Sequence, residues 1–176
     1  MRLVQKSPEV FIAEGPIAAI GVEEIEVLKS ALAKSPKGRV RINVHLNEDD
    51  RLHEMFIAFR PDSYIQPHMH PSKTESFHLV HGAVDIVVFE GDGRVRQVIP
   101  LSAGDPKRAF YYRMSKPFFH TLVIRSDLLV IHEITNGPFQ PSETVYASFA
   151  PPASDAAAAA VYQTALAKKV DELGGA

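Results

Sequence analysis

The middle of the chain, residues 39–134, consists of short segments with the composition of β-strands, and no helical segment interrupts them. In the first of these segments every second residue is apolar, namely Val40, Ile42, Val44 and Leu46. Residues two apart in a strand face the same side, so this pattern indicates a half-buried strand. Similar segments follow at 55–60, 76–80, 84–90, 94–101, 110–114, 119–125 and 128–134, and turn residues separate most of them. Short strands in close succession predict an antiparallel sandwich or barrel.

Helical patterns flank this β region on both sides. After a short strand at 10–13, the residues Ile25, Leu28 and Leu32 recur at helical spacing and predict a helix over 22–34. Near the other end, a run of alanines starting at Ala156 favours a second helix, because alanine has the highest helix propensity.

These elements predict a single structural domain. Residues 1–38 would form a strand and a helix that pack on a barrel at 39–152, and residues 153–176 would form the final helix. We expect Gly174 and Gly175 to end that helix.

Charge and composition narrow the classes of partner. The chain has 176 residues and a formal net charge of −2, so no overall positive field draws it to nucleic acid or to an anionic membrane. No apolar run approaches the roughly 20 residues of a membrane span, and the first residues do not read as a signal peptide. We therefore expect a cytoplasmic protein whose partner is a small molecule.

The histidines of one segment indicate a metal site. His68 and His70 are two residues apart, so both imidazoles can face one side of a strand. Glu75 opens the next strand after a short turn, and His120 lies near the start of a later strand whose alternate residues are apolar. The chain has no cysteine, so a bound metal must use nitrogen and oxygen ligands.

Three imidazoles and one carboxylate suit a divalent transition metal such as Zn, Fe(II), Mn, Ni or Cu. The absence of a cage of oxygen ligands argues against Ca and Mg. Four protein ligands leave a position open on a five- or six-coordinate ion, as a catalytic or ligand-binding site requires. The sequence leaves the identity of the metal open.

Other polar residues are candidates for supporting roles. Of the neighbours His132 and Glu133 only one can face inward, and we favour Glu133 as a partner of the metal ligands. His45 shares a strand face with Asn43, and that face can line the pocket or meet water. Strand alternation places His78 on the face opposite Glu75, and we expect His81, at a strand end, to be solvated; His53 receives no role.

The residues around the histidines resemble the first motif of the cupin superfamily. The matching segments are Ser63-Tyr64-Ile65, Pro67-His68-x-His70, Lys73-x-Glu75-Ser76-Phe77-His78 and Gly82, and the version of the motif is that of the WbuC-type cupin-fold metalloproteins. Further agreement lies at Arg39-x-Arg41-x-Asn43-x-His45, Phe110-Tyr111-Tyr112-Arg113, Phe119-His120-Thr121 and Glu133-x-Thr135-Asn136-Gly137-Pro138-Phe139. Met69 departs from this pattern, because many relatives have a basic residue there.

The resemblance implies a mainly β protein, a cupin (jelly-roll) antiparallel β-barrel with an N-terminal and a C-terminal helix. It also implies a mononuclear metal held by His68, His70, Glu75 and His120, and an association with bacterial surface polysaccharide, notably the O-antigen of lipopolysaccharide. A homodimer is expected, as is common among cupins. The resemblance supplies no reaction.

Three functions fit these expectations. The first is a metal-dependent enzyme, isomerase- or epimerase-like, that acts on a small sugar or sugar-nucleotide precursor, with Tyr64, Lys73 or Arg113 as candidate catalytic residues alongside His45. The second is a non-enzymatic sensor that binds a sugar or another metabolite. The third is a non-haem iron dioxygenase, because three histidines and a glutamate can also hold Fe(II).

Overall fold

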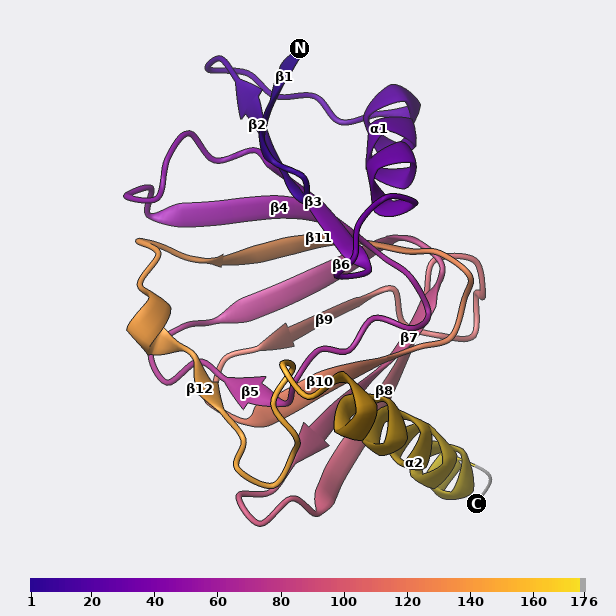
Figure 1. The fold of residues 1–176 in the computed structure, drawn as a ribbon. Helices are drawn as coiled ribbons and strands as arrows, with labels where there is room; N and C mark the ends of the chain where they lie inside the picture. The colour runs from indigo at the N-terminus through magenta and orange to yellow at the C-terminus, as the bar shows by residue number, and fades with distance from the viewer. Residues whose placement is uncertain (175–176) are drawn as a thin grey trace.

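The computed structural model describes residues 1–174 and consists of two β-sheets that face each other, with a helix on the outer side of each (Figure 1). The seven-stranded sheet has the order β1 (Arg2–Ser7), β2 (Val10–Glu14), β3 (Arg39–Asn43), β4 (Leu52–Phe59), β11 (Leu129–Asn136), β6 (Glu75–His81) and β9 (Tyr111–Met114). The five-stranded sheet has the order β12 (Val145–Tyr146), β5 (His68–Met69), β10 (Phe119–Ile124), β7 (Ala83–Phe89) and β8 (Val95–Ser102). Helix α1 spans Val22–Leu32, α2 spans Ala156–Gly174, and a single 3₁₀ turn spans Pro141–Glu143.

The strands pair antiparallel with one exception among the described pairs. β2 and β3 are parallel, and α1 connects them, because a parallel pair needs a crossover that returns the chain to the same end of the sheet. The mainly β architecture with a helix near each end is confirmed. The two sheets face each other as a jelly roll and do not close into one continuous barrel.

The main apolar core lies between the two sheets. It combines alternate residues of β4, β6 and β11 from one sheet with those of β7 and β10 from the other, among them Ile57, Phe77, Ile131, Ile86 and Leu122. Because alternate residues of a strand face opposite sides, the remaining residues of these strands face outward.

Each outer face has its own apolar cluster. Leu28 and Leu32 of α1 pack on Val40, Ile42 and other residues of the seven-stranded sheet. Leu166 and Val170 of α2 pack on Val87, Phe89 and Val123 of the five-stranded sheet. The Asp155 carboxylate caps α2 by accepting a hydrogen bond from the Ala158 amide at 3.0 Å.

The ends of several elements differ from the sequence expectation. The first helix ends at Leu32, and the strand predicted to continue from Val40 through Leu46 ends at Asn43. β4 begins at Leu52, three residues before the predicted start. β1, β5 and β12 were not predicted, because a two-residue strand is too short to show a period of two and β1 lacks the alternation. Of the two glycines expected to end the last helix, Gly175 lies outside the described residues.

Within residues 1–174, no helix is at once long enough and apolar enough to cross a membrane.

Candidate metal centre

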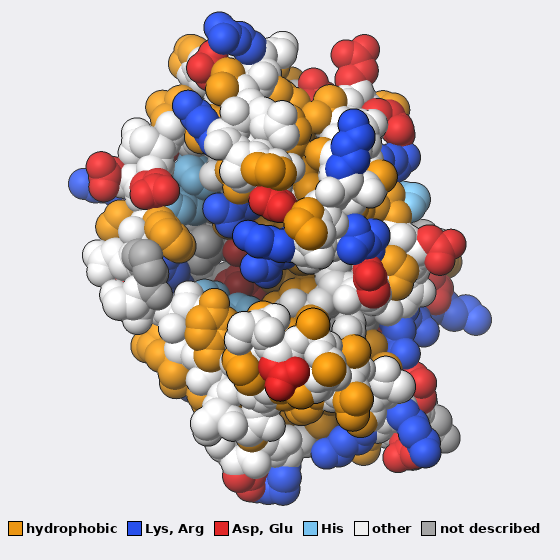
Figure 2. Space-filling view, viewed as in Figure 1, with side chains coloured by type: hydrophobic (Ala, Val, Ile, Leu, Met, Phe, Trp, Pro, Cys, Tyr) orange, Lys and Arg blue, Asp and Glu red, His pale blue; other side chains and the backbone are white. Residues whose placement is uncertain are grey.

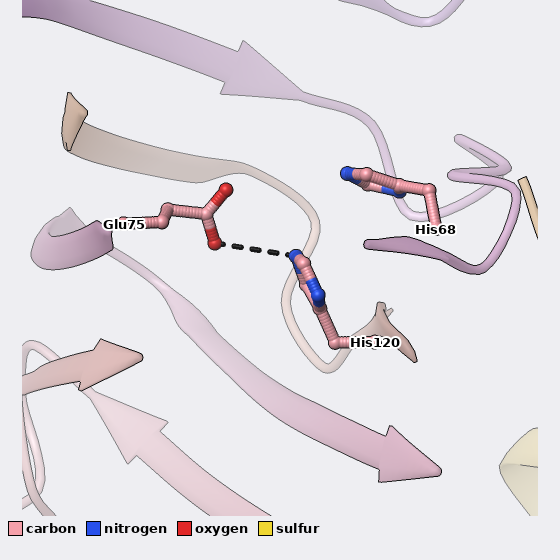
Figure 3. A group of neighbouring side chains, drawn as sticks. All are labelled: His68, Glu75 and His120. Atoms are coloured by element: carbon pink, nitrogen blue, oxygen red, sulfur yellow. Dashed lines mark ion pairs between the residues drawn. The ribbon is translucent and has the colours of Figure 1, made fainter. Parts of the chain in front are cut away.

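The two sheets bring three of the four predicted metal ligands together. His68 and His120 are direct partners in the pairing of β5 with β10, so their side chains stand side by side on the inner face of the five-stranded sheet. Glu75 reaches the same place from the first residue of β6 in the opposite sheet. One ligand atom from each of the three residues lies within 4.8 Å of the others, and Figure 3 shows the side chains converging.

His70, the fourth predicted ligand, lies beside this group. Its Nε2 atom is 3.8 Å from Oε2 of Glu75. Its ring centroid is 5.0 Å from that of His68 and 6.2 Å from that of His120. All four predicted side chains therefore border one small volume, although Glu75 comes from the opposite sheet and not from a position next to the histidine strand.

In His68, His70 and His120, the Nδ1 atom of the imidazole is hydrogen-bonded to a backbone carbonyl oxygen. Nδ1 lies 2.9 Å from the Gln66 oxygen in His68, 3.2 Å from the Glu143 oxygen in His70 and 3.0 Å from the Phe118 oxygen in His120. A carbonyl oxygen can only accept a hydrogen bond, so Nδ1 must carry the hydrogen in each ring. In the neutral imidazole this leaves Nε2 with a free lone pair, the state in which histidine binds a metal.

The Glu75 carboxylate is buried and held by two neighbours. The Tyr112 hydroxyl donates a hydrogen bond to Oε1 of Glu75 at 2.6 Å, and Nε2 of His120 lies 3.3 Å from the same oxygen. Burial alone would raise the pKa of Glu75, but the His120 and Tyr112 contacts outweigh it and lower this pKa to about 2. The carboxylate is therefore ionised across the physiological range.

The pKa values of His68 and His120 are shifted in opposite directions, although burial acts to lower both. Burial, together with the neighbouring His120, lowers the pKa of His68 to about 4, which keeps its imidazole neutral. Burial also acts to lower the pKa of His120, but the negative charge of Glu75 overcomes this and raises it.

The residues fit a bound divalent transition metal. Nε2 of His120 is buried and has no hydrogen-bond partner among the described residues, although it faces a carboxylate oxygen at 3.3 Å. A buried polar atom without a partner is costly unless another group satisfies it. Converging imidazole nitrogens and one carboxylate are the donor set that transition metals accept.

The centre lies in the wall of a cavity of about 500 Å³ between the two sheets. Figure 2 shows its mouth as a hollow with histidine and acidic side chains inside and Lys and Arg side chains beside it. Apart from the metal ligands, the polar or charged residues that line the cavity are Ser7, Glu9, Lys37, Arg39, Arg41, Tyr64, Gln66, Thr121, Glu133, Thr144 and Tyr146. The volume is in the range of sites that bind small molecules.

Glu133 takes the inward orientation. It pairs with Phe77 across β11 and β6 and lines the cavity, whereas His132 stacks on Phe56 of the outer face, with ring centroids 4.5 Å apart. Burial, with the nearby charge of Glu75, raises the pKa of Glu133 to about 8. At neutral pH this carboxyl group is mostly protonated.

Asn43 and His45 line a smaller cavity of about 140 Å³ beside the main one, together with Glu133 and His70. The polar face of the β3 segment thus meets a pocket, one of the two outcomes that the alternation allowed. Oδ1 of Asn43 is buried there without a hydrogen-bond partner among the described residues. His45 stacks on His53, with ring centroids 4.1 Å apart, and His53 is buried although the sequence assigned it no role.

The surface histidines lie as predicted, His78 from strand alternation and His81 from its place at a strand end. His78 and His81 are both exposed on the outer side of β6 and its end.

Of the three candidate catalytic residues, Lys73 borders the predicted metal ligands, lining a small pocket with His70, Glu75 and His120. Tyr64 lines the cavity, but its hydroxyl donates to the Pro151 carbonyl oxygen at 2.9 Å, and burial raises its pKa to about 12. Lys73 lines the smaller cavity and pairs with Glu143 at 3.2 Å. Arg113 is exposed and lines none of the described pockets, because its neighbour Tyr112 takes the inward position on β9.

Sequence reasoning missed Tyr112 and the arginine pair. Tyr112 lies in a motif that matches the cupin pattern and received no role of its own, although the alternation along Tyr111-Tyr112-Arg113 marks one inward residue. Arg39 and Arg41 matched the cupin-like pattern but received no role, and the structure places both in the cavity wall.

Comparisons with known proteins agree with this architecture. The family model "Domain of unknown function (DUF6016)" matches residues 20–101. A search of curated proteins found no sequence match. Among solved structures, CapF bound to the inhibitor 3-isopropenyl-tropolone is similar, with a TM-score of 0.52 and 17% identity over 64% of this chain and 32% of that chain.

Two further structures show the same likeness. A protein from Shewanella oneidensis has a TM-score of 0.52 and 10% identity over 64% of this chain and 75% of its own. Oxalate decarboxylase from Bacillus subtilis has a TM-score of 0.50 and 16% identity over 62% of this chain and 28% of its own. The matched region thus spans a third or less of CapF and of oxalate decarboxylase. At these identities the likeness concerns the fold, and the chain has the cupin fold.

Proposed function

We propose that this protein binds one divalent transition metal ion through His68, His70, Glu75 and His120 and presents it to a small molecule in the main cavity. The observation that carries the proposal is the set of three imidazoles whose Nδ1 atoms are each bound to a backbone carbonyl oxygen. Because Nδ1 is bound in each ring, Nε2 is the nitrogen that faces the same space as the Glu75 carboxylate. Zn, Fe, Mn and Ni all suit such a donor set.

A bound metal would supply a Lewis acid that polarises an oxygen atom of the ligand. The residues of the chain would orient the metal ligands and supply a proton. Tyr112 orients the Glu75 carboxylate through its hydroxyl hydrogen bond, and the carbonyl oxygens fix the planes of the imidazoles. The carboxyl group of Glu133, protonated at neutral pH, can give a proton to a ligand oxygen in the cavity.

The substrate class that we propose is a small sugar or a sugar-nucleotide precursor. The support is a cavity of about 500 Å³ with many hydrogen-bonding groups in its wall, which suits a ligand rich in oxygen. The resemblance to the WbuC-type cupins adds an association with bacterial surface polysaccharide, such as the O-antigen. Both the substrate and this context are our proposals.

A second candidate is a metal-organised sensor that binds the same kind of ligand without turning it over. The observation that favours it is that two of the three candidate catalytic groups are not free to act at the metal centre. The Tyr64 hydroxyl is occupied by a carbonyl oxygen, and Arg113 lies outside the described pockets.

Elemental analysis of protein purified without a histidine tag tests the metal site. We expect about one transition metal ion per chain in the wild type and loss of that metal in Glu75→Gln and His120→Gln. His78→Gln is the matched control, because His78 is exposed on the outer face of β6 and should keep the metal. Wild-type protein that takes up no transition metal would overturn the proposal.

Ligand screening then separates the two candidate functions. A thermal-shift screen of sugars and nucleotide sugars on metal-loaded protein identifies ligands that bind the folded state. Turnover of a ligand found in this way, lost in Glu75→Gln, indicates an enzyme. Saturable binding without turnover, isomer exchange or oxygen uptake indicates a sensor.

A further inference from the structure

One wall of the main cavity carries a row of basic side chains. Lys37, Arg39 and Arg41 all line it, from the turn before β3 and from β3 itself. The intervening residues Val40 and Ile42 are buried against α1 on the outer face of the sheet. Alternation along β3 therefore fixes both arginines on the inner face, on the sheet opposite His68 and His120.

The two guanidinium groups are unpaired in a protein that pairs most of its arginines. Arg60 bonds Asp62 at 3.0 Å, Arg94 bonds Asp92 at 2.7 Å, and Arg125 bonds both Asp85 and Asp171 at 2.7 Å. Across residues 1–174, by contrast, the guanidinium group of neither Arg39 nor Arg41 takes part in an ion pair or a hydrogen bond. Glu9 and Glu133 line the same cavity, yet neither forms an ion pair with these arginines.

Two arginines on the same strand face in the wall of a cavity are suited to bind an anion. The guanidinium group is a rigid fork of donors that matches the oxygens of a carboxylate or phosphate, and it is always charged. Residues two apart on a strand stand roughly 7 Å apart, so two forks can approach one anion from different sides. A phosphate group has three terminal oxygen atoms and a charge of about −1.5 to −2, so it can accept two forks and balance two positive charges, whereas a carboxylate has two oxygens and a single charge.

We propose that Arg39 and Arg41 bind the phosphate group of the ligand, and that the site therefore takes a phosphorylated sugar or nucleotide sugar rather than a neutral sugar. This inference rests on the proposed function, because it assigns the metal centre and the arginine pair to one ligand that bridges the cavity. The ligand's sugar oxygens face the metal centre beside His68 and His120 on one sheet, while its phosphate faces β3 on the other. Arg39 and Arg41 are thus specificity-determining residues.

Isothermal titration of metal-loaded protein with glucose 6-phosphate, glucuronate and glucose tests the class of ligand. We expect glucose 6-phosphate to bind at least 10-fold more tightly than glucose, with affinity falling as salt concentration rises. Tighter binding of glucuronate than of glucose 6-phosphate would overturn the phosphate assignment. Equal binding of all three compounds would overturn the role of the arginine pair.

Variants assign the effect to the arginines. In Arg39→Gln/Arg41→Gln we expect at least a 10-fold loss of affinity for glucose 6-phosphate, only partly restored in Arg39→Lys/Arg41→Lys, because lysine keeps the charge but lacks the fork. Arg113→Gln is the control, since Arg113 is exposed and outside the described pockets. Elemental analysis and circular dichroism should show unchanged metal content and fold in each variant. Unchanged glucose 6-phosphate affinity in a folded, metal-loaded double variant would overturn the proposal.

Inorganic phosphate separates this inference from the metal assignment. Chelator-treated protein titrated with phosphate and followed by NMR should show saturable shifts at β3 in the wild type and none in the double glutamine variant. That result supports the arginine site even if the wild type binds no metal. Phosphate shifts that persist in the double variant would count against it.

Discussion

Glu75 is the residue at which burial and ionisation conflict most directly. It is 5% exposed, its carboxylate lies among imidazoles, and the hydroxyl of Tyr112 is its hydrogen-bond donor at 2.6 Å. A buried carboxylate is tolerated when hydrogen bonds and opposite charges compensate for the loss of water. The contacts of Glu75 therefore determine whether its carboxylate is ionised and held in place in the metal-free protein.

Tyr112→Phe tests this dependence. The substitution removes the donor to Glu75 and keeps the aromatic ring, which packs edge-on against Phe77 with centroids 5.0 Å apart. We expect metal affinity, measured by competition with a chromophoric chelator, to fall about 10-fold, as is typical when a group that orients a metal ligand is lost. Tyr111→Phe, at an exposed neighbouring position, should leave the affinity unchanged. Equal metal affinity in both variants would show that the hydroxyl does not orient the ligand.

Glu133 should make the metal-free protein less stable as the pH rises. Its pKa is raised from 4.5 to about 8 in the folded state, so between these values the folded protein binds more protons than the unfolded chain. The free energy of unfolding must then fall with rising pH, by about 1.4 kcal/mol for each pH unit at most. His120, whose pKa is also raised, acts in the same direction above 6.5, whereas His68, with a pKa lowered to about 4, acts oppositely below 6.5.

Glu133→Gln therefore has a predicted pH signature. Between pH 6.5 and pH 8 the wild type should lose up to about 2 kcal/mol of stability through Glu133, and the variant should lose only the part due to His120. Urea unfolding of chelator-treated protein at several pH values measures the two slopes. Parallel slopes for wild type and variant would contradict the burial of an ionisable Glu133.

At the scale of elements, the tight connection between β6 and β7 carries the chain from one sheet to the other. β6 belongs to the sheet that carries Glu75, and β7 pairs with the strand that carries His120. Gly82 joins them with a φ of +87°, a conformation that residues with a side chain rarely adopt. A Cβ atom there would also clash with the Leu128 carbonyl oxygen and the Ser126 hydroxyl.

Gly82→Ala should destabilise the protein by about 3 kcal/mol, because both the backbone conformation and the space are unsuited to a side chain. Gly91→Ala in the hairpin between β7 and β8 is the control, since a Cβ atom built there meets nothing within 4 Å. Urea unfolding at equilibrium measures the difference between the two variants. Similar stability for both would mean that the connection between β6 and β7 can relax around an added side chain.

The packing of the helices concerns the prediction that the chain forms one domain, with an end segment on each side of the β region. α1 and β3 share one apolar cluster, and α2 shares another with the five-stranded sheet, so both end segments pack on the β-structure. The boundaries at residues 38 and 152, and the expected homodimer, stay predictions.

For the whole molecule, the position of the core predicts how the fold responds to loss of metal. The apolar residues between the sheets form a continuous cluster, and each outer face adds a further cluster around a helix. The burial of these side chains does not involve the metal ligands, so the fold should persist without an ion.

We therefore expect chelation to lower the melting temperature without unfolding the protein at 25 °C. A metal present at 100 times its dissociation constant stabilises the folded state by about 2.7 kcal/mol, which corresponds to a shift of roughly 5–10 °C for a chain of this size. Far-UV circular dichroism and a thermal scan with and without EDTA measure both effects. Loss of the β-sheet signal on chelation would identify a structural metal instead.

The sequence by itself determined the strand-rich middle of the chain, the flanking helices and the set of candidate metal ligands. Each depends on neighbours a few positions apart, as in the His68–His70 spacing or the alternation along β3, and such patterns are visible without a partner strand. The orientation of Glu133 rather than His132 toward the cavity follows the same rule.

Only the tertiary structure decided which residues meet. Pairing of β5 with β10 sets His68 opposite His120, and the facing of the two sheets sets Glu75, Tyr112 and the arginines of β3 around one cavity. Contacts between segments far apart in the chain depend on strand pairing and on packing between sheets. Local periodicity predicts neither of these.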